Sequence, residues 1–419
     1  MFTSLHGLRC TNEDCGARFS DDLRLLRCEK CGDYLEAEYA LDAARDSLTR
    51  QTLAGRVFNQ WRYHEVLPIR EEKSIVSLHE GGTPLTRSLR LGEQMGLKNL
   101  FFKDESRNPT GSFKDRGASV TLSKCREIGA GPVVISSSGN AGASFAAYSA
   151  VAQHEAFIFL RPNCGDVITV QTAMYGKTTF STTGTIPQQG ALIAELSQQR
   201  GWFHTGVPLN LYRVEGKKTE AYEIVEQLGW RAPDRIVCPT GGGTNIIALH
   251  KGFLELEAMQ WIDRRPKLVA IQRAECAPIA KAFKTASEMV PWAASSPPVS
   301  HECGDDIVIK APNPAGGPAV LKAIDATDGV VEDVTEAEVI EAERLLAETE
   351  GIYVQAATAA GIAGLIKLSD AGLIDREELI VCINTGSGKN NPPNMRRAST
   401  APVCIEPTVE AFDRATQGL

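Results

Sequence analysis

Short apolar runs alternate with longer amphipathic stretches along most of this chain. The short runs are rich in β-branched residues, which is typical of strands buried inside a parallel sheet. They lie at 99–105, 132–138, 156–160, 178–182, 235–240, 267–273 and 378–385. The stretches between them predict helices at 113–128, 141–152, 188–199, 217–228, 244–259, 335–349 and 355–370. This alternation predicts an α/β fold of doubly wound open sheets with helices on both faces, where ligands bind beyond the carboxyl ends of the strands.

The pattern changes at both ends of the chain and once inside it. Residues 285–320 are rich in Pro, Ser and Gly and interrupt the alternation, which fits either a linker or a functional lid. The C-terminal tail lacks periodicity, so we expect it to be peripheral. We expect a small β module at 1–40, a helical connector and arm at 41–98, a large α/β domain at 99–125 and 201–394, a smaller α/β domain at 126–200, and the tail at 395–419.

The composition narrows the class of partner. The 419 residues include 44 Lys and Arg against 52 Asp and Glu, a net charge of −8, with no basic block. A general nucleic-acid binder needs a concentrated Lys and Arg surface to displace counterions, so we expect a small-molecule partner and no nucleic acid. The N-terminal residues lack the apolar core of a signal peptide, and no apolar run reaches the length of a membrane span. We therefore expect a cytoplasmic protein with no membrane partner.

Four of the 11 cysteines are grouped near the N-terminus, as CTNEDC and CEKC. Two such pairs on hairpins can place four thiolates at the corners of a tetrahedron, the geometry that zinc prefers. The pattern resembles a zinc ribbon, although the first pair is more widely spaced than the second. The alternative is a set of reduced cysteines without metal. We expect a structural zinc site, because four protein ligands leave no open position for catalysis, with the ligands Cys10, Cys15, Cys28 and Cys31.

Three segments end an apolar strand with glycine and hydroxyl residues and then open a helix. They are ESRNPTGSFKDRGAS around Lys114, VVISSSGNAGAS around Asn140, and IVCPTGGGTNIIALHKGF around the loop 240–245. Helix N-termini and exposed backbone amides bind anions, so this layout suits a phosphate or a carboxylate. A glycine loop before a helix can also be only a tight turn, and a lysine early in a helix is usually solvated. The three segments together therefore predict a ligand site, which none of them predicts alone.

Together, and in this order, these segments resemble the pyridoxal-phosphate enzymes of fold type II. Within that group the similarity is greatest to the threonine synthase family, and it covers most of the chain. It is carried by WRYHEVLP, SLHEGGTPL, FKDESRNPTGSFKDRG, SSSGNAGAS, YRVEGKKTEAYEIVEQLGW and RPKLVAIQRAECAPIAKAF. The resemblance implies the type II fold, with two open sheets, and pyridoxal phosphate as the cofactor.

The resemblance assigns roles to the residues that match the family's motifs. It implies that Lys114 binds the cofactor covalently and acts as the catalytic acid and base, which requires an amine that is often neutral. It implies that Asn140 donates to the 3′-oxygen of the pyridine ring and that Thr385 faces the ring nitrogen. The cofactor phosphate would be surrounded by Gly241, Gly242, Gly243, Thr244 and Asn245. The substrate would be held at its carboxylate by Ser137, Ser138 and Gly139, and at its phosphate by Arg213. The alternative for Arg213 is a surface pair with Glu215.

The reaction implied by the resemblance converts O-phospho-L-homoserine and water into L-threonine and phosphate, by elimination at Cγ and addition at Cβ. The family includes monomers and homodimers, so the resemblance allows a homodimer. The chain departs from the family pattern where Val207 and Pro208 replace an asparagine–serine pair, Gln355 replaces a glutamate, and Gly242 replaces an asparagine. These departures keep open β-replacement or β-elimination on an activated serine, as in cysteate synthases or dehydratases. A non-catalytic protein that keeps the fold is the third interpretation.

Overall fold

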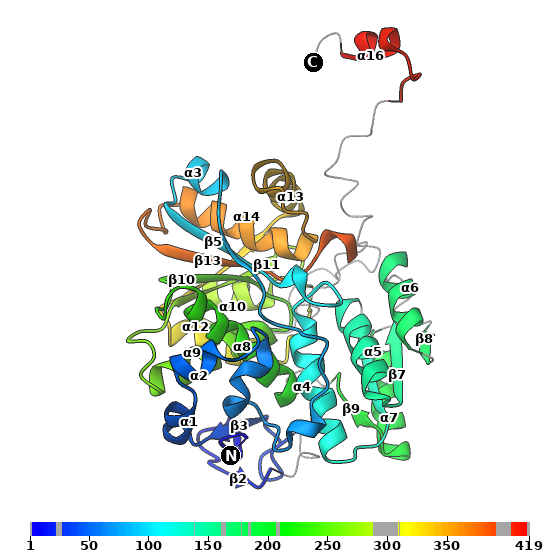
Figure 1. Ribbon diagram of the computed structural model, residues 1–419, viewed down its shortest axis with the longest axis vertical. Coiled ribbons are helices and arrows are strands. Elements are labelled where there is room, and N and C mark those ends of the chain that lie inside the picture. The colour runs from blue at the N-terminus through cyan, green and yellow to red at the C-terminus, as the bar shows by residue number, and fades with distance from the viewer. Residues whose placement is uncertain are drawn as a thin grey trace.

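The structure is a computed structural model, shown as a ribbon in Figure 1. The residues that it describes are 2–21, 27–137, 139–160, 165–176, 178–182, 186–206, 210–287, 309, 311–390 and 404–416. These described residues form three sheets, one for the N-terminal module and two for the remainder. Figure 1 shows the N-terminal module at the bottom, the larger sheet on the left and the smaller sheet with its helices on the right.

The N-terminal module is a three-stranded antiparallel sheet with β1 in the middle. Its strands are β1 (Leu5–Cys10), β2 (Arg18–Phe19) and β3 (Leu35–Tyr39). The connector that follows contains the short helices α1 (Leu41–Ser47) and α2 (Arg50–Ala54) and the 3-10 turns η1 (Gln60–Val66) and η2 (Glu72–Ser74). The predicted β module and helical connector are therefore both present.

The larger sheet has the strand order β12-β11-β10-β13-β5-β4. Its members are β4 (Leu85–Arg87), β5 (Asn99–Asp104), β10 (Arg235–Pro239), β11 (Lys267–Arg273), β12 (Val330–Val334) and β13 (Leu379–Asn384). All neighbouring strands are parallel except for β4, which pairs antiparallel with β5 at one edge. Every residue of β10 and β13 is buried, as the continuous apolar runs predicted. The sequence did not predict β4 or β12, because β4 is short and β12 carries two acidic residues.

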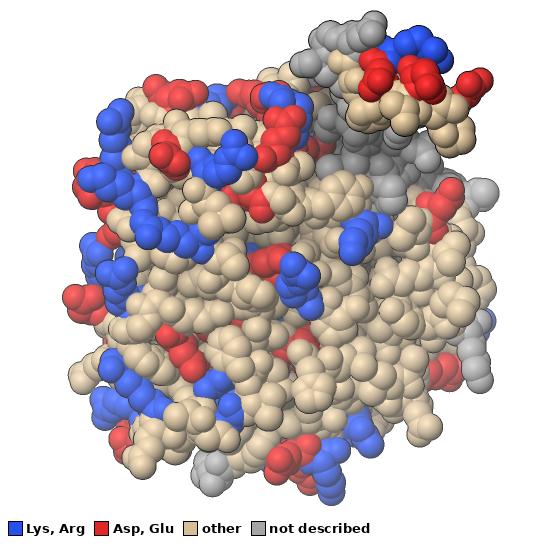
Figure 2. Space-filling model, turned by 45° about the horizontal axis from the view of Figure 1, so that its top comes forward, with Lys and Arg blue, Asp and Glu red and all other residues tan. Residues whose placement is uncertain are grey.

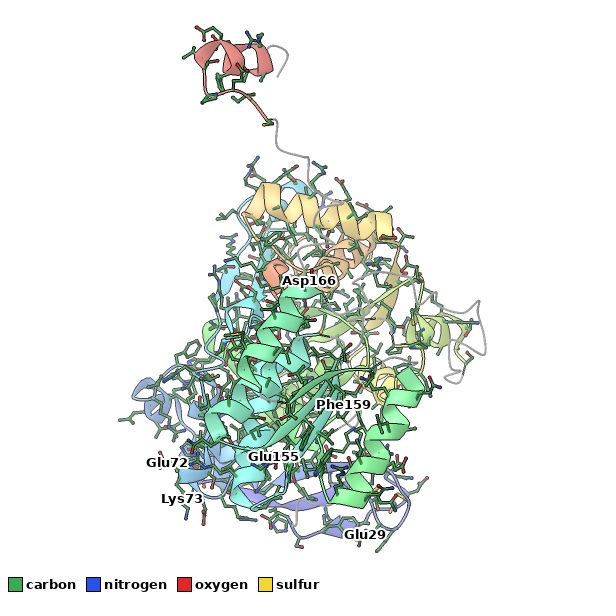
Figure 3. The ribbon with its side chains drawn as sticks, turned by 90° about the vertical axis from the view of Figure 1, so that its right-hand side faces the viewer. Glu29, Glu72, Lys73, Glu155, Phe159 and Asp166 are labelled. Carbon is green, nitrogen blue, oxygen red and sulfur yellow. The ribbon has the colours of Figure 1, made fainter. Side chains whose placement is uncertain are left out.

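The smaller sheet is fully parallel and has the order β8-β7-β6-β9. Its strands are β6 (Val133–Ser137), β7 (Ala156–Leu160), β8 (Thr179–Ser181) and β9 (Phe203–His204), and its helices are α5 (Asn140–Ala152), α6 (Asp166–Tyr175) and α7 (Ile186–Arg200). In Figure 3 this sheet faces the viewer, with Phe159 on β7 and Glu155, just before the start of that strand, lower in the view. β9 pairs with β6, so this sheet extends past the predicted boundary at residue 200. The domain boundaries remain a prediction.

The helices around the larger sheet include those that the sequence predicted and several that it did not. The long ones are α4 (Lys114–Glu127), α8 (Leu211–Gln227), α9 (Thr244–Ala258), α13 (Glu336–Glu350) and α14 (Ala356–Asp370). The shorter ones are α3 (Leu91–Met95), η3 (Glu105–Arg107), α10 (Pro278–Thr285), α12 (Gly317–Asp325) and η5 (Gly388–Asn390). α8 begins earlier than predicted because the side chain of Asn210 accepts from the N–H of Tyr212 and caps its first turn.

The loop at 285–320 and the C-terminal tail are the two segments for which the sequence shows no periodicity. Most of the long loop at 285–320 lies outside the described residues, and its last part forms the start of α12. In the tail, α16 (Val409–Thr416) lies apart from the main body in Figure 1, which agrees with the expected peripheral position. Among the described residues, no helix is both long and apolar enough to cross a bilayer. On the face shown in Figure 2, Lys and Arg are interspersed with Asp and Glu.

A buried set of ion pairs holds α4 against α8. The guanidinium of Arg116 binds Glu105 at 2.7 Å and Glu223 at 2.6 Å, and the ammonium of Lys103 binds Glu223 at 2.7 Å. None of these four side chains is exposed. The two helices also meet closely at Gly216, where a Cβ would lie 2.1 Å from the carbonyl oxygen of Arg116. α4 and α8 therefore have a fixed relative position, and each carries one of the predicted site residues in its first turn.

Candidate functional site

One pocket gathers residues from the ends of β10 and β13 and from the starts of α4, α9 and α14. Its lining includes Lys114, Gly241, Gly242, Gly243, Thr244, Asn245 and Thr385, all of which the sequence had singled out. The other lining residues are Phe113, Pro239, Thr240, Ile246, Ile309, Gln355 and Ala357. The pocket lies beyond the carboxyl ends of β10 and β13, where an open α/β sheet is expected to bind its ligand.

Lys114 is the first residue of α4 and is half-buried. Its turn is held to the end of β13, because the N–H of Phe113 donates to the carbonyl of Thr385 at 3.2 Å. The next residue, Asp115, accepts from both the N–H and the hydroxyl of Thr110 and from the hydroxyl of Ser144. These contacts fix the direction in which the Lys114 side chain leaves the helix.

The environment of Lys114 favours a neutral amine. Burial, and secondly the nearby cation of Arg213, lower the pKa of Lys114 from 10.5 to about 7. The Nζ atom lies 4.0 Å from the centroid of the Phe113 ring. An amine that is neutral near pH 7 can attack a carbonyl and can then accept a proton. This is the property that the resemblance required of Lys114.

The glycine loop ends at the N-terminus of α9. Gly243 is the N-cap residue and has φ = +88°, and a Cβ there would lie 2.5 Å from Cγ2 of Val320. A Cβ on Gly242, in contrast, would meet no atom within 4 Å. The first N–H groups of a helix have no partner within it, so this end of the pocket suits an anion.

Asn245 reaches the pocket mainly through its backbone. Its side-chain Nδ2 donates to Glu220 at 3.1 Å and to the sulfur of Cys238 at 3.5 Å. Its Oδ1 is buried and has no hydrogen-bond partner among the described residues. The side chain is thus directed to α8, and a role beside a phosphate would belong to the main chain.

A row of amides joins the three sides of the pocket. Asn140, at the start of α5, donates from Nδ2 to Oε1 of Gln355 at 2.9 Å and accepts from Nδ2 of Asn390 at 2.9 Å. Thr385 lies 3.0 Å from the hydroxyl of Thr358, at the first turn of α14. Asn140 and Thr385 are both almost fully buried. Two predicted cofactor residues are therefore positioned by side chains from α14 and η5.

The turn before α5 is built around Ser137. Its hydroxyl accepts from the N–H groups of Gly139 at 3.1 Å and of Gly142 at 2.8 Å. Ser137 therefore shapes the turn into α5, and the role of Ser137 and Gly139 in binding a substrate remains a prediction. Ser138 lies outside the described residues, as do the divergent positions Val207 and Pro208.

Arg213 lies in the first turn of α8 and is half-buried. Its Nη1 donates to the carbonyl of Thr205 at 3.4 Å, and its guanidinium lies 5.8 Å from the Phe145 ring centroid. Burial lowers the pKa of Arg213 to about 10. The alternative of a pair with Glu215 is not seen, because Glu215 binds Lys218 and Lys251 instead. Burial is the main cause of the lowered pKa of Lys114, and the Arg213 cation is the second.

The sequence did not assign site roles to several residues that line the pocket or contact residues of the site. They are Phe113, Lys217, Gln355, Thr358 and Asn390. Gln355 had a signal in the sequence, since it stands where the family pattern has a glutamate. Lys217 had none, because a KK pair on a helix does not reveal which lysine is buried.

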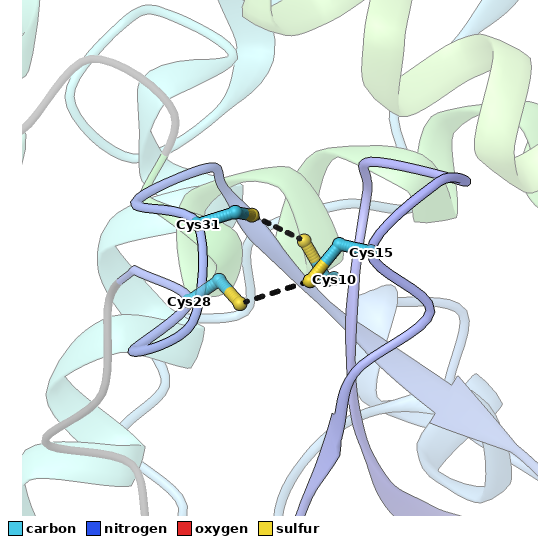
Figure 4. A group of neighbouring side chains, drawn as sticks. All are labelled: Cys10, Cys15, Cys28 and Cys31. Carbon is cyan, nitrogen blue, oxygen red and sulfur yellow. Dashed lines mark hydrogen bonds between the residues drawn. The ribbon is translucent and has the colours of Figure 1, made fainter.

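The four N-terminal cysteines meet as predicted. Their sulfur atoms all lie within 4.8 Å of one another, and Figure 4 shows that they come from two facing loops. Cys10 and Cys31 are 3.4 Å apart, and Cys15 and Cys28 are 3.7 Å apart. Burial raises the pKa of Cys28, but hydrogen bonds from the N–H groups of Cys31 and Lys30 and from the thiols of Cys31 and Cys10 together lower that pKa to about 7. Four sulfurs at this spacing fit a tetrahedral zinc ion.

The pocket also fits the cofactor that the resemblance implies. It offers a largely neutral amine for an aldehyde, a helix N-terminus for a phosphate, and the Asn140 and Thr385 side chains for the polar atoms of a ring. The open space beside Gly242 is consistent with a ligand at this end.

Known proteins agree with this interpretation of the pocket. Residues 76–386 match the model of the family described as "Pyridoxal-phosphate dependent enzyme". A threonine synthase of Methanocaldococcus jannaschii is 39% identical over 97% of this chain and 98% of its own length. A threonine synthase of Methanosarcina acetivorans is 35% identical over 99% of both chains. The solved structure of a fungal L-serine ammonia-lyase from Rhizomucor miehei covers 75% of this chain and 96% of its own, with a TM-score of 0.63 at 19% identity. The predicted resemblance and fold class are confirmed, and the chain belongs to the family of pyridoxal-phosphate dependent enzymes.

Proposed function

We propose that this protein is a threonine synthase-like lyase that converts O-phospho-L-homoserine and water into L-threonine and phosphate. The observation that carries the proposal is the arginine of α8 beside the pocket amine. After burial, the Arg213 cation is the second cause that lowers the pKa of Lys114, and an arginine there can bind a phosphate on the substrate's side chain. The two threonine synthases that match nearly the whole chain support the same assignment.

Each residue of the pocket has a distinct task in this reaction. Pyridoxal phosphate, when bound, withdraws electrons from Cα of the amino acid. Lys114 removes the proton from Cα and then one from Cβ, and phosphate leaves from Cγ. One proton is then added at Cγ, which becomes the methyl carbon, and Lys114 returns the other to Cα after water has added at Cβ. Arg213 holds the phosphate that leaves from Cγ. The hydroxyl of Thr385 would face the ring nitrogen without protonating it, which favours elimination over transamination.

The proposal is tested by measuring phosphate release from O-phosphohomoserine by the wild-type protein, an Arg213 variant and a control variant. The wild-type protein is expected to release inorganic phosphate from O-phosphohomoserine and to form threonine. Arg213→Gln is expected to lower kcat/KM by about 10- to 100-fold, the effect of losing a hydrogen bond between charged groups, while cofactor content is retained. Arg200→Gln, on the surface helix α7, is the control and should not change either value.

A second candidate follows from Gln355, where the threonine synthase pattern has a glutamate. Gln355 contacts Asn140 directly, so the lost carboxylate lies inside the site. The candidate reaction is β-replacement or β-elimination on an activated serine. A panel of O-phosphohomoserine, O-phosphoserine, O-acetylserine, serine and threonine distinguishes the two. Turnover of a serine derivative without any phosphate release from O-phosphohomoserine would reject the first proposal.

We also propose that the four N-terminal cysteines bind a structural zinc ion. The purified protein is expected to contain about one zinc ion per chain. Cys28→Ser should lose this zinc, whereas Cys404→Ser, a free and exposed cysteine, should retain it. Elemental analysis of the metal in both variants checks the prediction. Full zinc content in Cys28→Ser would contradict the proposed ligand set.

We infer that the protein works in the cytoplasm on a small amino acid. A homodimer, and the absence of nucleic-acid and membrane partners, remain predictions from the sequence. Sedimentation of the purified protein would establish the number of subunits.

A further inference from the structure

Lys217 is a buried lysine without a partner. Its side chain is 0% exposed, and its Nζ has no hydrogen-bond partner among the described residues. The neighbouring residue, Lys218, is just as buried, but it binds Glu215 at 2.6 Å and Glu255 at 2.8 Å. A buried ammonium normally has such a counter-charge, because removing it from water is costly. Lys217 therefore stands out in the part of the chain that the structure describes.

The amine of Lys217 lies beside Phe113, a residue that lines the pocket. Its Nζ is 4.8 Å from the ring centroid of Phe113, the same ring that lies 4.0 Å from Nζ of Lys114. Lys217 also follows Arg213 by four residues, so both project from one face of α8. Three basic side chains, Lys114, Arg213 and Lys217, thus surround one end of the site.

The acidic residue nearest in sequence on this face does not pair with Lys217. Glu220 accepts from Asn245 through Oε2, and its Oε1 has no hydrogen-bond partner among the described residues. Burial, and secondly Glu105, raise the pKa of Glu220 to about 8, so this carboxyl group is largely protonated at neutral pH. Burial and the cations of Lys114 and Arg213 lower the pKa of Lys217 well below 10.5. An anion bound in the pocket would raise the pKa of Lys217 and so favour its charged ammonium form.

We propose that Lys217 donates from Nζ to a phosphate group bound between α8 and the N-terminus of α9. Two phosphates can reach this end of the pocket, that of the cofactor and that of a phosphorylated amino acid. The first depends only on membership of the pyridoxal-phosphate family, whereas the second rests on the function proposed above. Lys217 is then a phosphate ligand additional to the residues identified from the sequence.

The experiment compares Lys217→Met and Lys217→Arg with the control Lys218→Met in the full-length chain. In one arm, protein freed of cofactor is titrated with pyridoxal phosphate and with pyridoxal, which lacks the phosphate. In the other arm, the holoenzyme is titrated with inorganic phosphate. If Lys217 binds the cofactor's phosphate, Lys217→Met is expected to weaken the binding of pyridoxal phosphate about 10- to 100-fold but not that of pyridoxal. If it binds the substrate's phosphate, the variant is expected to weaken the binding of inorganic phosphate by a similar factor. The arm in which binding weakens shows whether Lys217 contacts the phosphate of the cofactor or that of the substrate. Lys217→Arg is expected to retain most of the wild-type affinity in that arm.

Thermal melting of the cofactor-free chain separates a ligand role from a structural one. Methionine has a volume similar to that of lysine and needs no counter-charge, so Lys217→Met should leave the melting temperature unchanged or raise it. Lys218→Met breaks two buried ion pairs and should lower it by several degrees. A lower melting temperature in Lys217→Met, with unchanged affinity in both arms, would overturn the proposal. Equal weakening for pyridoxal phosphate and pyridoxal would overturn it as well.

The two proposals can fail independently. If the wild-type holoenzyme does not release phosphate from O-phosphohomoserine, the proposed function fails. The difference between pyridoxal phosphate and pyridoxal in Lys217→Met is measured without any turnover and would still establish Lys217 as a phosphate ligand.

Discussion

Lys114→Ala is expected to lower the turnover of O-phosphohomoserine by at least about 1,000-fold, because one amine serves as attachment point and as acid and base. Borohydride reduction of the wild-type holoenzyme, followed by peptide mass spectrometry, should find the cofactor on the peptide containing Lys114. Lys73→Ala removes a lysine that is 81% exposed on its side chain and should retain full activity. Attachment to Lys217, the other buried amine beside Phe113, would contradict the assignment.

The rate at which the cofactor attaches should follow the neutral form of Lys114. Burial and Arg213 place the pKa near 7, so the rate is expected to fall about tenfold per pH unit below 7 and to level off above it. Arg213→Gln removes one of the two causes that lower this pKa, so its midpoint should move to higher pH. A midpoint that stays unchanged in Arg213→Gln would show that burial alone sets the pKa.

Arg116→Met is expected to lower the free energy of unfolding by about 3–5 kcal/mol. The variant leaves Glu105 and Glu223 buried, with only Lys103 still paired to Glu223. A loss of this size is a large share of the roughly 5–15 kcal/mol that stabilises a typical protein. Chemical denaturation measures it, and Arg344→Met is the control. Arg344 also pairs with two glutamates, Glu341 and Glu348, but on the exposed surface of α13, so little change is expected.

The same network makes stability depend on acid. Burial alone would raise the pKa of Glu223, but the cations of Arg116 and Lys103 outweigh it and hold that pKa well below the ordinary 4.5. The folded state therefore binds this proton less readily than the unfolded state. Its contribution to stability is complete above about pH 4.5 and is lost as the pH falls. In Arg116→Met the pKa of Glu223 should rise, so acid unfolding should begin at a higher pH than in the wild type.

The buried ion pairs of Arg116 also link the stability of the protein to the geometry of the pocket. Arg116 follows Lys114 by two residues on α4, and Glu223 lies on α8 together with Arg213. Holding the two helices together therefore sets the distance between the amine and the arginine of the pocket. A fully buried network of charges has a strict geometry, because each displaced partner leaves an uncompensated charge.

In both sheets the long apolar strands were predicted from the sequence, whereas two of the shortest strands were not. β10 and β13 are continuous apolar runs, and such runs have few alternatives to a buried parallel strand. β9 and β4 were missed because each has too few residues for a period, and only pairing with β6 and β5 makes them strands. The start of α8 was missed because the cap at Asn210 depends on a single side chain.

The sequence by itself determined the alternation of most strands and helices, the glycine turns and the grouping of the four cysteines, because these depend on local pattern. Through its motifs it also named Lys114, Asn140 and Thr385 as candidate site residues. The tertiary structure decided which groups lack a partner. It separated Lys217 from Lys218, directed the side chain of Asn245 to Glu220, and placed Gln355 against Asn140. Burial and charge depend on residues distant in the chain, and a sequence pattern contains no distances between them.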